Sequence, residues 1–192
     1  MSPTPIAPPT ISLPNLSLDA NGNLSYYDFG GSEITENNNN KDFVLIGVEG
    51  PDKTIFDAES KNRHFHIVNK TNKTSIEGIT FRNGKETQSY QGASIDISNS
   101  DITFKNCKWV DNELRNGYRG GAIVVNRDAS ASFYDSHFKN NRIIYDDKSN
   151  TGNSEGGAIY IEEARDQNIH SQLIKIHNSI FEGNHIVNFS NS

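Results

Sequence analysis

Short stretches of alternating apolar and polar residues recur along this 192-residue chain, and Gly, Asn or Asp separates them. Four stretches share one pattern, in which an aromatic residue follows another apolar residue by five positions. The four pairs are Ile76 and Phe81, Phe104 and Trp109, Phe133 and Phe138, and Ile176 and Phe181. Alternation with a period of two predicts β-strands, and the break inside each stretch predicts two short strands joined at a corner.

Helices are excluded in these same stretches. Gly, Asn, Ser and Thr recur inside every candidate window, and no capped stretch of a dozen good helix formers exists. We therefore predict an all-β protein.

The four aromatic residues lie 28, 29 and 43 positions apart. Internal repetition on this scale is typical of solenoids, in which each repeat stacks only on its neighbours. A second repeated word, which begins a third strand, occurs at Gly92-Ala93, Gly121-Ala122 and Gly157-Ala158. Three short strands per unit predict a right-handed parallel β-helix of about five coils, stacked about 4.8 Å apart.

In this arrangement the eight paired residues form two ladders inside the cylinder: Ile76, Phe104, Phe133 and Ile176 in one, and Phe81, Trp109, Phe138 and Phe181 in the other. Each aromatic is followed three positions later by Gly84, Asn112, Asn141 or Asn184. We expect these residues to take the left-handed conformation at a corner, with stacked Asn side chains hydrogen-bonded along the axis. Cys107 shares its position with Ser136 and Ser179, which favours a packing role over catalysis.

The N-terminal residues differ in composition, since five of the six prolines fall within the first fourteen. Residues 1–18 are therefore predicted to be a linker or tail. Residues 19–192 form one β-helix domain, with an entry cap and imperfect first coil at 19–60 and regular coils at 61–192. No signal peptide or membrane span is evident, so a cytosolic protein and a processed or truncated form of a secreted one both remain open.

The stretch after Phe181 contains no capping element. We expect the array to continue in a longer parent chain, with end-to-end association or a plug made by Ile186, Val187 and Phe189 as the alternatives.

Composition agrees with a solenoid, whose core is thin: 33% of the residues are hydrophobic. The formal net charge is −6, and there is no basic stripe, zinc-ligand spacing or nucleic-acid module. A DNA or RNA partner is therefore not expected. The negative net charge favours solubility, or surroundings outside the cell that are rich in cations.

The motif Gly-Gly-Ala-Ile occurs at residues 120–123 and 156–159, and the motif Phe-x-x-Asn occurs at 138–141 and 181–184. Both motifs resemble the repeats of chlamydial polymorphic membrane proteins. Residues 45–57 and 76–81 are similar to adhesin-like surface proteins of methanogenic archaea and to the wider pectate-lyase-like superfamily. The resemblance covers residues 41–189. It implies a right-handed parallel β-helix at the cell surface or outside the cell, often in an adhesin or passenger domain, and it implies no particular reaction.

Related β-helices include polysaccharide lyases and glycoside hydrolases, which need clustered carboxylates. Asp96, Glu162 and Glu163 are outward carboxylates, but we expect Asn126 to be their aligned neighbour on the middle coil. Solvated strand residues are therefore the favoured interpretation, and no catalytic residue is assigned. The six histidines are scattered over several coil positions, and Asp146-Asp147 lacks further ligands at loop spacing, so neither a metal nor a cofactor is predicted.

Three loops, of which the last is the longest, follow the aromatic corners and are expected to emerge along one edge. They contain Tyr90, Arg115, Tyr118, Arg119, Tyr145, Asp146 and Asp147. Tyr and Arg are frequent anchors of recognition surfaces, and a Tyr ring can stack on a sugar, although loops of any solenoid accumulate such residues. A second loop at 163–172 leaves another edge. We predict a non-enzymatic module that binds a glycan or a cell-surface protein, with a carbohydrate-cleaving enzyme as the alternative.

Overall fold

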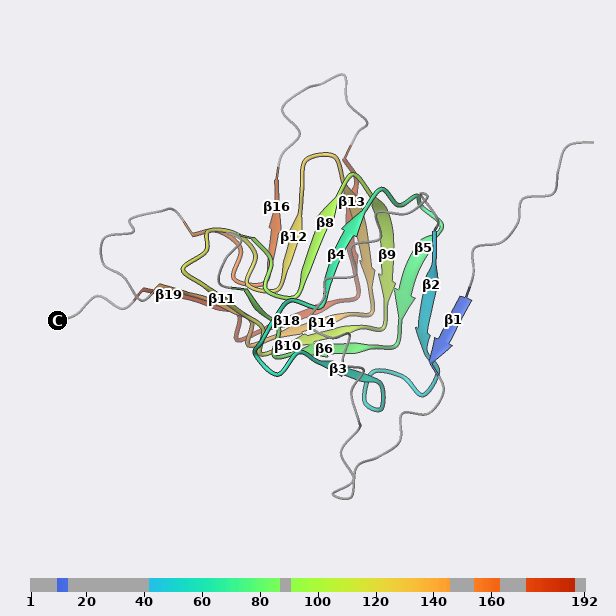
Figure 1. Ribbon diagram of the computed structural model, residues 1–192, viewed down its shortest axis with the longest axis horizontal. Helices are drawn as coiled ribbons and strands as arrows, with labels where there is room; N and C mark the ends of the chain where they lie inside the picture. Colours follow the sequence, from blue (N-terminus) through green and yellow to red (C-terminus); the bar gives the residue numbers. More distant parts are fainter. Residues whose placement is uncertain (1–9, 14–41, 87–90, 146–153, 163–171, 189–192) are drawn as a thin grey trace, which may run out of the picture.

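The computed structural model describes residues 10–13, 42–86, 91–145, 154–162 and 172–188. In this part the chain is a parallel β-solenoid of about three turns, built from four parallel sheets (Figure 1). Three turns, β5–β8, β9–β12 and β13–β16, place one strand in every sheet, while β2–β4 and β17–β19 form partial turns. The expected count of about five coils is reached only when both partial turns are included.

We number the sheets in the order in which a turn visits them. The first sheet contains β1 (Thr10–Leu13), β2 (Val44–Gly47), β5 (Thr74–Glu77), β9 (Asp101–Lys105), β13 (Ser130–Tyr134) and β17 (Ile174–His177). The second contains β3 (Ile55–Asp57), β6 (Thr80–Arg82), β10 (Lys108–Val110), β14 (His137–Lys139) and β18 (Ile180–Glu182). The third contains β7 (Lys85–Glu86), β11 (Glu113–Arg115), β15 (Arg142–Tyr145) and β19 (His185–Asn188). The fourth contains β4 (Phe65–Val68), β8 (Ile95–Ser98), β12 (Ile123–Val125) and β16 (Ile159–Ile161).

The third sheet corrects the expectation of three strands per coil. Its strands begin immediately after the corner, in segments that we expected to be loops. Leu114 lies between Glu113 and Arg115, Ile143 lies between Arg142 and Ile144, and the side chains of Leu114 and Ile143 are fully buried. This short alternation is sufficient to form a strand, because each buried residue packs against the one in the turn beside it.

Two ladders of side chains fill the solenoid. One register position of the second sheet is occupied in successive turns by Phe56, Phe81, Trp109, Phe138 and Phe181. The ring of Trp109 is fully buried and stacks between Phe81 and Phe138, with centroid distances of 5.6 and 4.6 Å. The first sheet carries the other ladder, Leu45, Ile76, Phe104, Phe133 and Ile176. Stacked rings in adjacent turns stabilise the pairing beyond the burial of their area.

The two ends of the ladders differ in exposure. Phe56, in the first partial turn, is 4% exposed, whereas Phe181 and Ile176, in the last described turn, are 47% and 48% exposed. End-to-end association of the protein through this last turn stays a prediction.

The asparagine ladder lies one residue beyond the left-handed corner, which corrects the expectation that the same residue serves both roles. Positive φ angles occur at Asn83, Asp111, Asn140 and Gly183. The following residues Asn112 and Asn141 are fully buried. The Nδ2 of Asn112 donates to Asn141 Oδ1 at 2.8 Å, and the Nδ2 of Asn141 donates to Asn184 Oδ1 at 2.9 Å. The expected hydrogen bonding along the axis is thus present, but between side chains inside the solenoid.

The glycine words align one residue away from the register predicted from sequence. Ile95, Ile123 and Ile159 are paired, so Gly92 aligns with the first glycine of each later pair, Gly120 and Gly156. All three of these glycines have positive φ, between 56° and 73°. A shift of one residue would turn the apolar side chains of β8 to the outer face, which fixes the register.

Candidate functional site

The loop edge that we predicted to bind a ligand contains a small core. Tyr90, Asp146 and Asp147 lie outside the described residues. Tyr145 is 4% exposed and packs with Leu114 and Ile143, against which Tyr118 also packs. The Tyr145 hydroxyl donates to the carbonyl of Gly117 at 2.5 Å, and burial raises the pKa of Tyr145. The Tyr145 ring is therefore packed inside this small core and does not lie on a surface where it could stack on a sugar.

The two arginines of this edge are engaged in ion pairs. Arg115 Nε donates to Glu113 Oε1 at 2.9 Å. Arg119 Nη1 donates to Glu162 Oε1 at 3.0 Å, and its guanidinium lies 4.9 Å from the centre of the Tyr160 ring. Arg127 also donates to this Glu162 oxygen, at 2.7 Å. The contacts to Glu162 join successive turns at the fourth sheet, whereas Arg115 and Glu113 lie on the same strand, β11.

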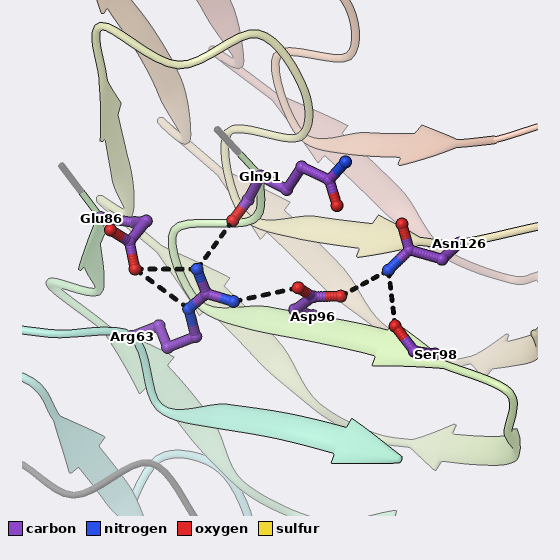
Figure 2. Close-up of polar contacts among 6 residues, drawn as sticks. All are labelled: Arg63, Glu86, Gln91, Asp96, Ser98 and Asn126. Atoms are coloured by element: carbon purple, nitrogen blue, oxygen red, sulfur yellow. Dashed lines mark hydrogen bonds and ion pairs between the residues drawn. The ribbon is translucent and has the colours of Figure 1, made fainter. Parts of the chain in front are cut away.

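Figure 2 shows a second polar group, which joins the fourth sheet to β7 of the third and which we call the Arg63 cluster: Arg63, Glu86, Asp96, Ser98 and Asn126. The Arg63 side chain is 4% exposed. Its Nη2 and Nε donate to Glu86 Oε2 at 2.8 and 3.2 Å, and its Nη1 donates to Asp96 Oδ2 at 3.1 Å. The guanidinium also donates to the carbonyl of Gln91 at 3.2 Å. One arginine therefore pairs with two largely buried carboxylates of the next turn.

The same cluster corrects the expected position of Asp96. Its aligned neighbours on the two adjacent strands are His66 and Val124, not Asn126. Asn126 reaches it from a diagonal position, donating from Nδ2 to Asp96 Oδ1 at 2.6 Å and to Ser98 Oγ at 2.8 Å. Both oxygens of the Asp96 carboxylate are thus hydrogen-bonded, which leaves it poorly suited to exchange a proton with a substrate.

The third sheet carries a comparable group around Glu113. Arg142 donates to Glu113 Oε2 from Nη2 at 2.8 Å and from Nε at 3.0 Å. Burial alone raises the pKa of Glu113, but the hydrogen bonds from Arg142 and Arg115 outweigh it and hold the pKa below its ordinary value. Glu113 is therefore ionised and paired, an arrangement that joins turns.

Two titratable side chains with unusual pKa values are also structural. His64 donates from Nε2 to the carbonyl of Phe56 at 2.9 Å and accepts at Nδ1 from Ser94 Oγ at 2.9 Å. Burial lowers the pKa of His64 to about 4, so the ring is neutral at pH 7. Burial raises the pKa of Cys107 to about 12. A thiol at such a pKa is not a nucleophile at neutral pH.

A groove of about 540 Å³ lies over the outer face of the first sheet, and no prediction from the sequence placed a site there. Its lining residues come from three strands and the segments beside them: Asn72, Asp101, Ile102, Thr103, Ser130, Ser132, Tyr134, Gln172, Leu173 and Lys175. The side chains of Asp101, Thr103, Ser132 and Lys175 make no hydrogen bond or ion pair with any other residue that the structure describes. The Tyr134 ring lies 6.1 Å from the ring of His177.

The alternation of β9 and β13 contains the signal for this groove. Ile102, Phe104, Ala131 and Phe133 are buried, so Thr103, Ser132 and Tyr134 must lie on the outer face. The sequence does not show that this face, rather than that of another sheet, is hollowed. Asn72, Gln172 and Leu173 also line the groove, and they lie in segments between strands.

In the described ranges, no three His, Cys, Asp or Glu side chains are placed to hold a metal ion. The described residues also include no helix that is long and apolar enough to cross a membrane. No family model matches this chain, and neither curated proteins nor solved structures give a match. Function is therefore inferred from the fold and the geometry of the described residues.

Proposed function

We propose that this chain is a non-catalytic module of a right-handed β-helix, located at the cell surface or outside the cell, and that it binds glycans as an adhesin or a structural component. The main support is the state of the carboxylates. Glu86, Asp96, Glu113 and Glu162 all accept hydrogen bonds from arginine. The groove, in contrast, has polar side chains with no partner among the described residues.

Glycoside hydrolysis requires two carboxyl groups that flank one bond and exchange protons with it. Among the residues that line the groove, Asp101 supplies the single carboxylate. The other outward carboxylates of the third and fourth sheets are held by arginines, which stabilise the charged form and oppose proton transfer. This distribution supports binding without cleavage.

Location outside the cell is proposed on two grounds. The Gly-Gly-Ala-Ile and Phe-x-x-Asn words resemble those of surface β-helices, and the acidic net charge of −6 suits a soluble, exposed module. A solenoid offers a long, rigid surface on which a ligand meets side chains from several turns at once.

One observation favours a polysaccharide lyase as the second candidate. Asp101, Tyr134 and Lys175 line the same groove, and each has a chemical group able to move a proton. A lyase would use such groups to remove a proton next to a uronate carboxyl group.

A glycan array combined with a cleavage assay on uronate polymers tests the two candidates. We expect the chain to bind at least one class of glycan and to release no unsaturated product. If a polymer is cleaved, and the activity disappears in Asp101→Asn or Lys175→Met, the lyase replaces the binding module. If the correctly folded chain binds no glycan and cleaves none, the proposed function is wrong.

A further inference from the structure

The floor of the groove is a regular grid of outward side chains. Strand pairing aligns Asp101 with Ser130, and it aligns Thr103 with Ser132 and Lys175. Tyr134 lines the groove at the next outward position, where its aligned neighbours Lys105 and His177 lie outside the lining. Neighbouring strands are separated by about 4.8 Å, so β9, β13 and β17 together span about 10 Å. The grid is therefore wide enough to contact a short oligosaccharide at several points, and the rigid strands hold those contacts in place.

The charges of the lining residues balance. Asp101 and Lys175 are its charged residues, and they carry opposite signs. The remaining polar groups are hydroxyls and amides, from Asn72, Thr103, Ser130, Ser132, Tyr134 and Gln172. The chain as a whole carries a net charge of −6, which repels polyanions at long range. Both facts disfavour a highly acidic polymer as the ligand.

We infer that this groove binds an uncharged, hydroxyl-rich oligosaccharide that lies across β9, β13 and β17, an inference that rests on the glycan binding proposed above. Tyr134 supplies a ring face on which a sugar can stack. The Asp101 carboxylate accepts hydrogen bonds from sugar hydroxyls, and the Lys175 ammonium donates to them. Thr103 and Ser132 can do either. Free donors and acceptors at fixed spacing are what a neutral sugar requires, since its hydroxyls present both kinds of group.

Ser132→Trp places a large ring in the centre of this grid without removing a buried group. Val110→Trp is the matched control: Val110 is a partly exposed, outward residue of β10, on the second sheet. Both purified variants and the wild type are titrated by calorimetry with soluble neutral oligosaccharides (glucans, mannans, xylans and galactans) and with polygalacturonate. Asp101→Asn and Tyr134→Ala provide smaller changes if Ser132→Trp fails to fold.

We expect the wild type and Val110→Trp to bind the same neutral probe, and Ser132→Trp to bind it about tenfold or more weakly. Equal binding by the two Trp variants would show that the glycan binds elsewhere; the groove assignment would be wrong while the proposed function stood. Binding of polygalacturonate alone, lost in Lys175→Met and weakened by salt, would overturn the neutral class. Failure of the wild type to bind any glycan on the array would instead refute the proposed function, and this inference with it.

Discussion

The outer faces of the fourth and first sheets both carry polar side chains, but these side chains have different roles on the two faces. On the fourth sheet, Arg63 and Asn126 occupy both oxygens of Asp96, and Arg119 and Arg127 converge on Glu162. On the first sheet, Asp101 and Lys175 face a groove and have no partner among the described residues. The same solenoid therefore has one face that joins turns and one that is available to a ligand.

The difference follows from where the charges lie relative to the turn beside them. Arg63 precedes β4, so its side chain can reach across to β8 of the next turn, where Asp96 lies. In the first sheet Asp101 aligns with Ser130, and Lys175 aligns with Ser132, so these two opposite charges do not face each other. Partial burial of a charge is tolerated when it is paired and hydrogen-bonded, and an unpaired charge must stay exposed to water or to a ligand.

The largest effect on the unfolding free energy is expected on the outer face of the fourth sheet, where the charged side chains are paired. Arg63→Ala leaves the Glu86 carboxylate without its arginine and removes one partner of Asp96 while both remain largely buried. Breaking a buried ion pair in this way costs about 3–5 kcal/mol of unfolding free energy, which urea denaturation can measure. Glycan binding by the folded fraction should not change.

Arg82→Ala is the matched control for this prediction. Arg82 also pairs with a carboxylate, Asp57, at 2.7 Å, but its side chain is 43% exposed. Asn83 and the backbone N–H of Glu59 continue to hold Asp57 after the change. We expect a cost of about 1 kcal/mol or less. Equal costs for the two variants would contradict the distinction between buried and exposed pairs.

A smaller effect, limited to acid, is expected at His64. Its pKa of about 4 in the folded state lies below the ordinary value of 6.5, so the unfolded chain binds a proton that the folded chain does not. The contribution of His64 to the unfolding free energy is therefore fully present above pH 6.5. It is lost as the pH falls from 6.5 towards 4, and the loss is about 3 kcal/mol at most.

Measuring the unfolding free energy of the wild type and of His64→Gln at several pH values checks this. The variant should start less stable at pH 7 and lose less stability between pH 6.5 and 4.5. Glu113 and Asp57, whose pKa values are lowered, act mainly below this window, because their ordinary values are 4.5 and 3.8. Parallel pH profiles of the two proteins would be evidence against a buried neutral His64.

The parallel solenoid was predictable because its signal is repeated. The aromatic positions of the second sheet recur with the same neighbours, and the strands of the first and second sheets follow from them. The third sheet was missed because its first strands contain few apolar residues. β7 contains none, and β11 contains one, Leu114, at the start of a segment that varies in length between turns. A single apolar residue beside a corner is too weak a pattern to separate a strand from a loop.

The ion pairs and the groove were not predictable for a different reason. The contact of Arg63 with Asp96 joins residues 33 positions apart and depends on the register of the fourth sheet. The glycine words suggested a register one residue away, which exchanges the two faces of a strand. The polar strand residues of the groove could be assigned to an outer face, but Asn72 and Leu173, which also line it, lie between strands, where no alternation indicates which way a side chain points.

The smallest effect on stability is expected on the outer face of the first sheet, in the groove. It is also the sharpest test of the difference between the two faces. Thr103→Ala and Ser132→Ala remove hydroxyls that bond to no other described residue. Each should change the unfolding free energy by about 0.5 kcal/mol or less, as is usual for surface positions, and the pair should still weaken binding of the neutral glycan. Asn141→Ala, in the buried ladder, removes partners from Asn112 and Trp109 and should cost about 1–3 kcal/mol. If the groove variants proved as destabilising as Asn141→Ala, their hydroxyls would be structural, and the two faces would no longer differ in kind.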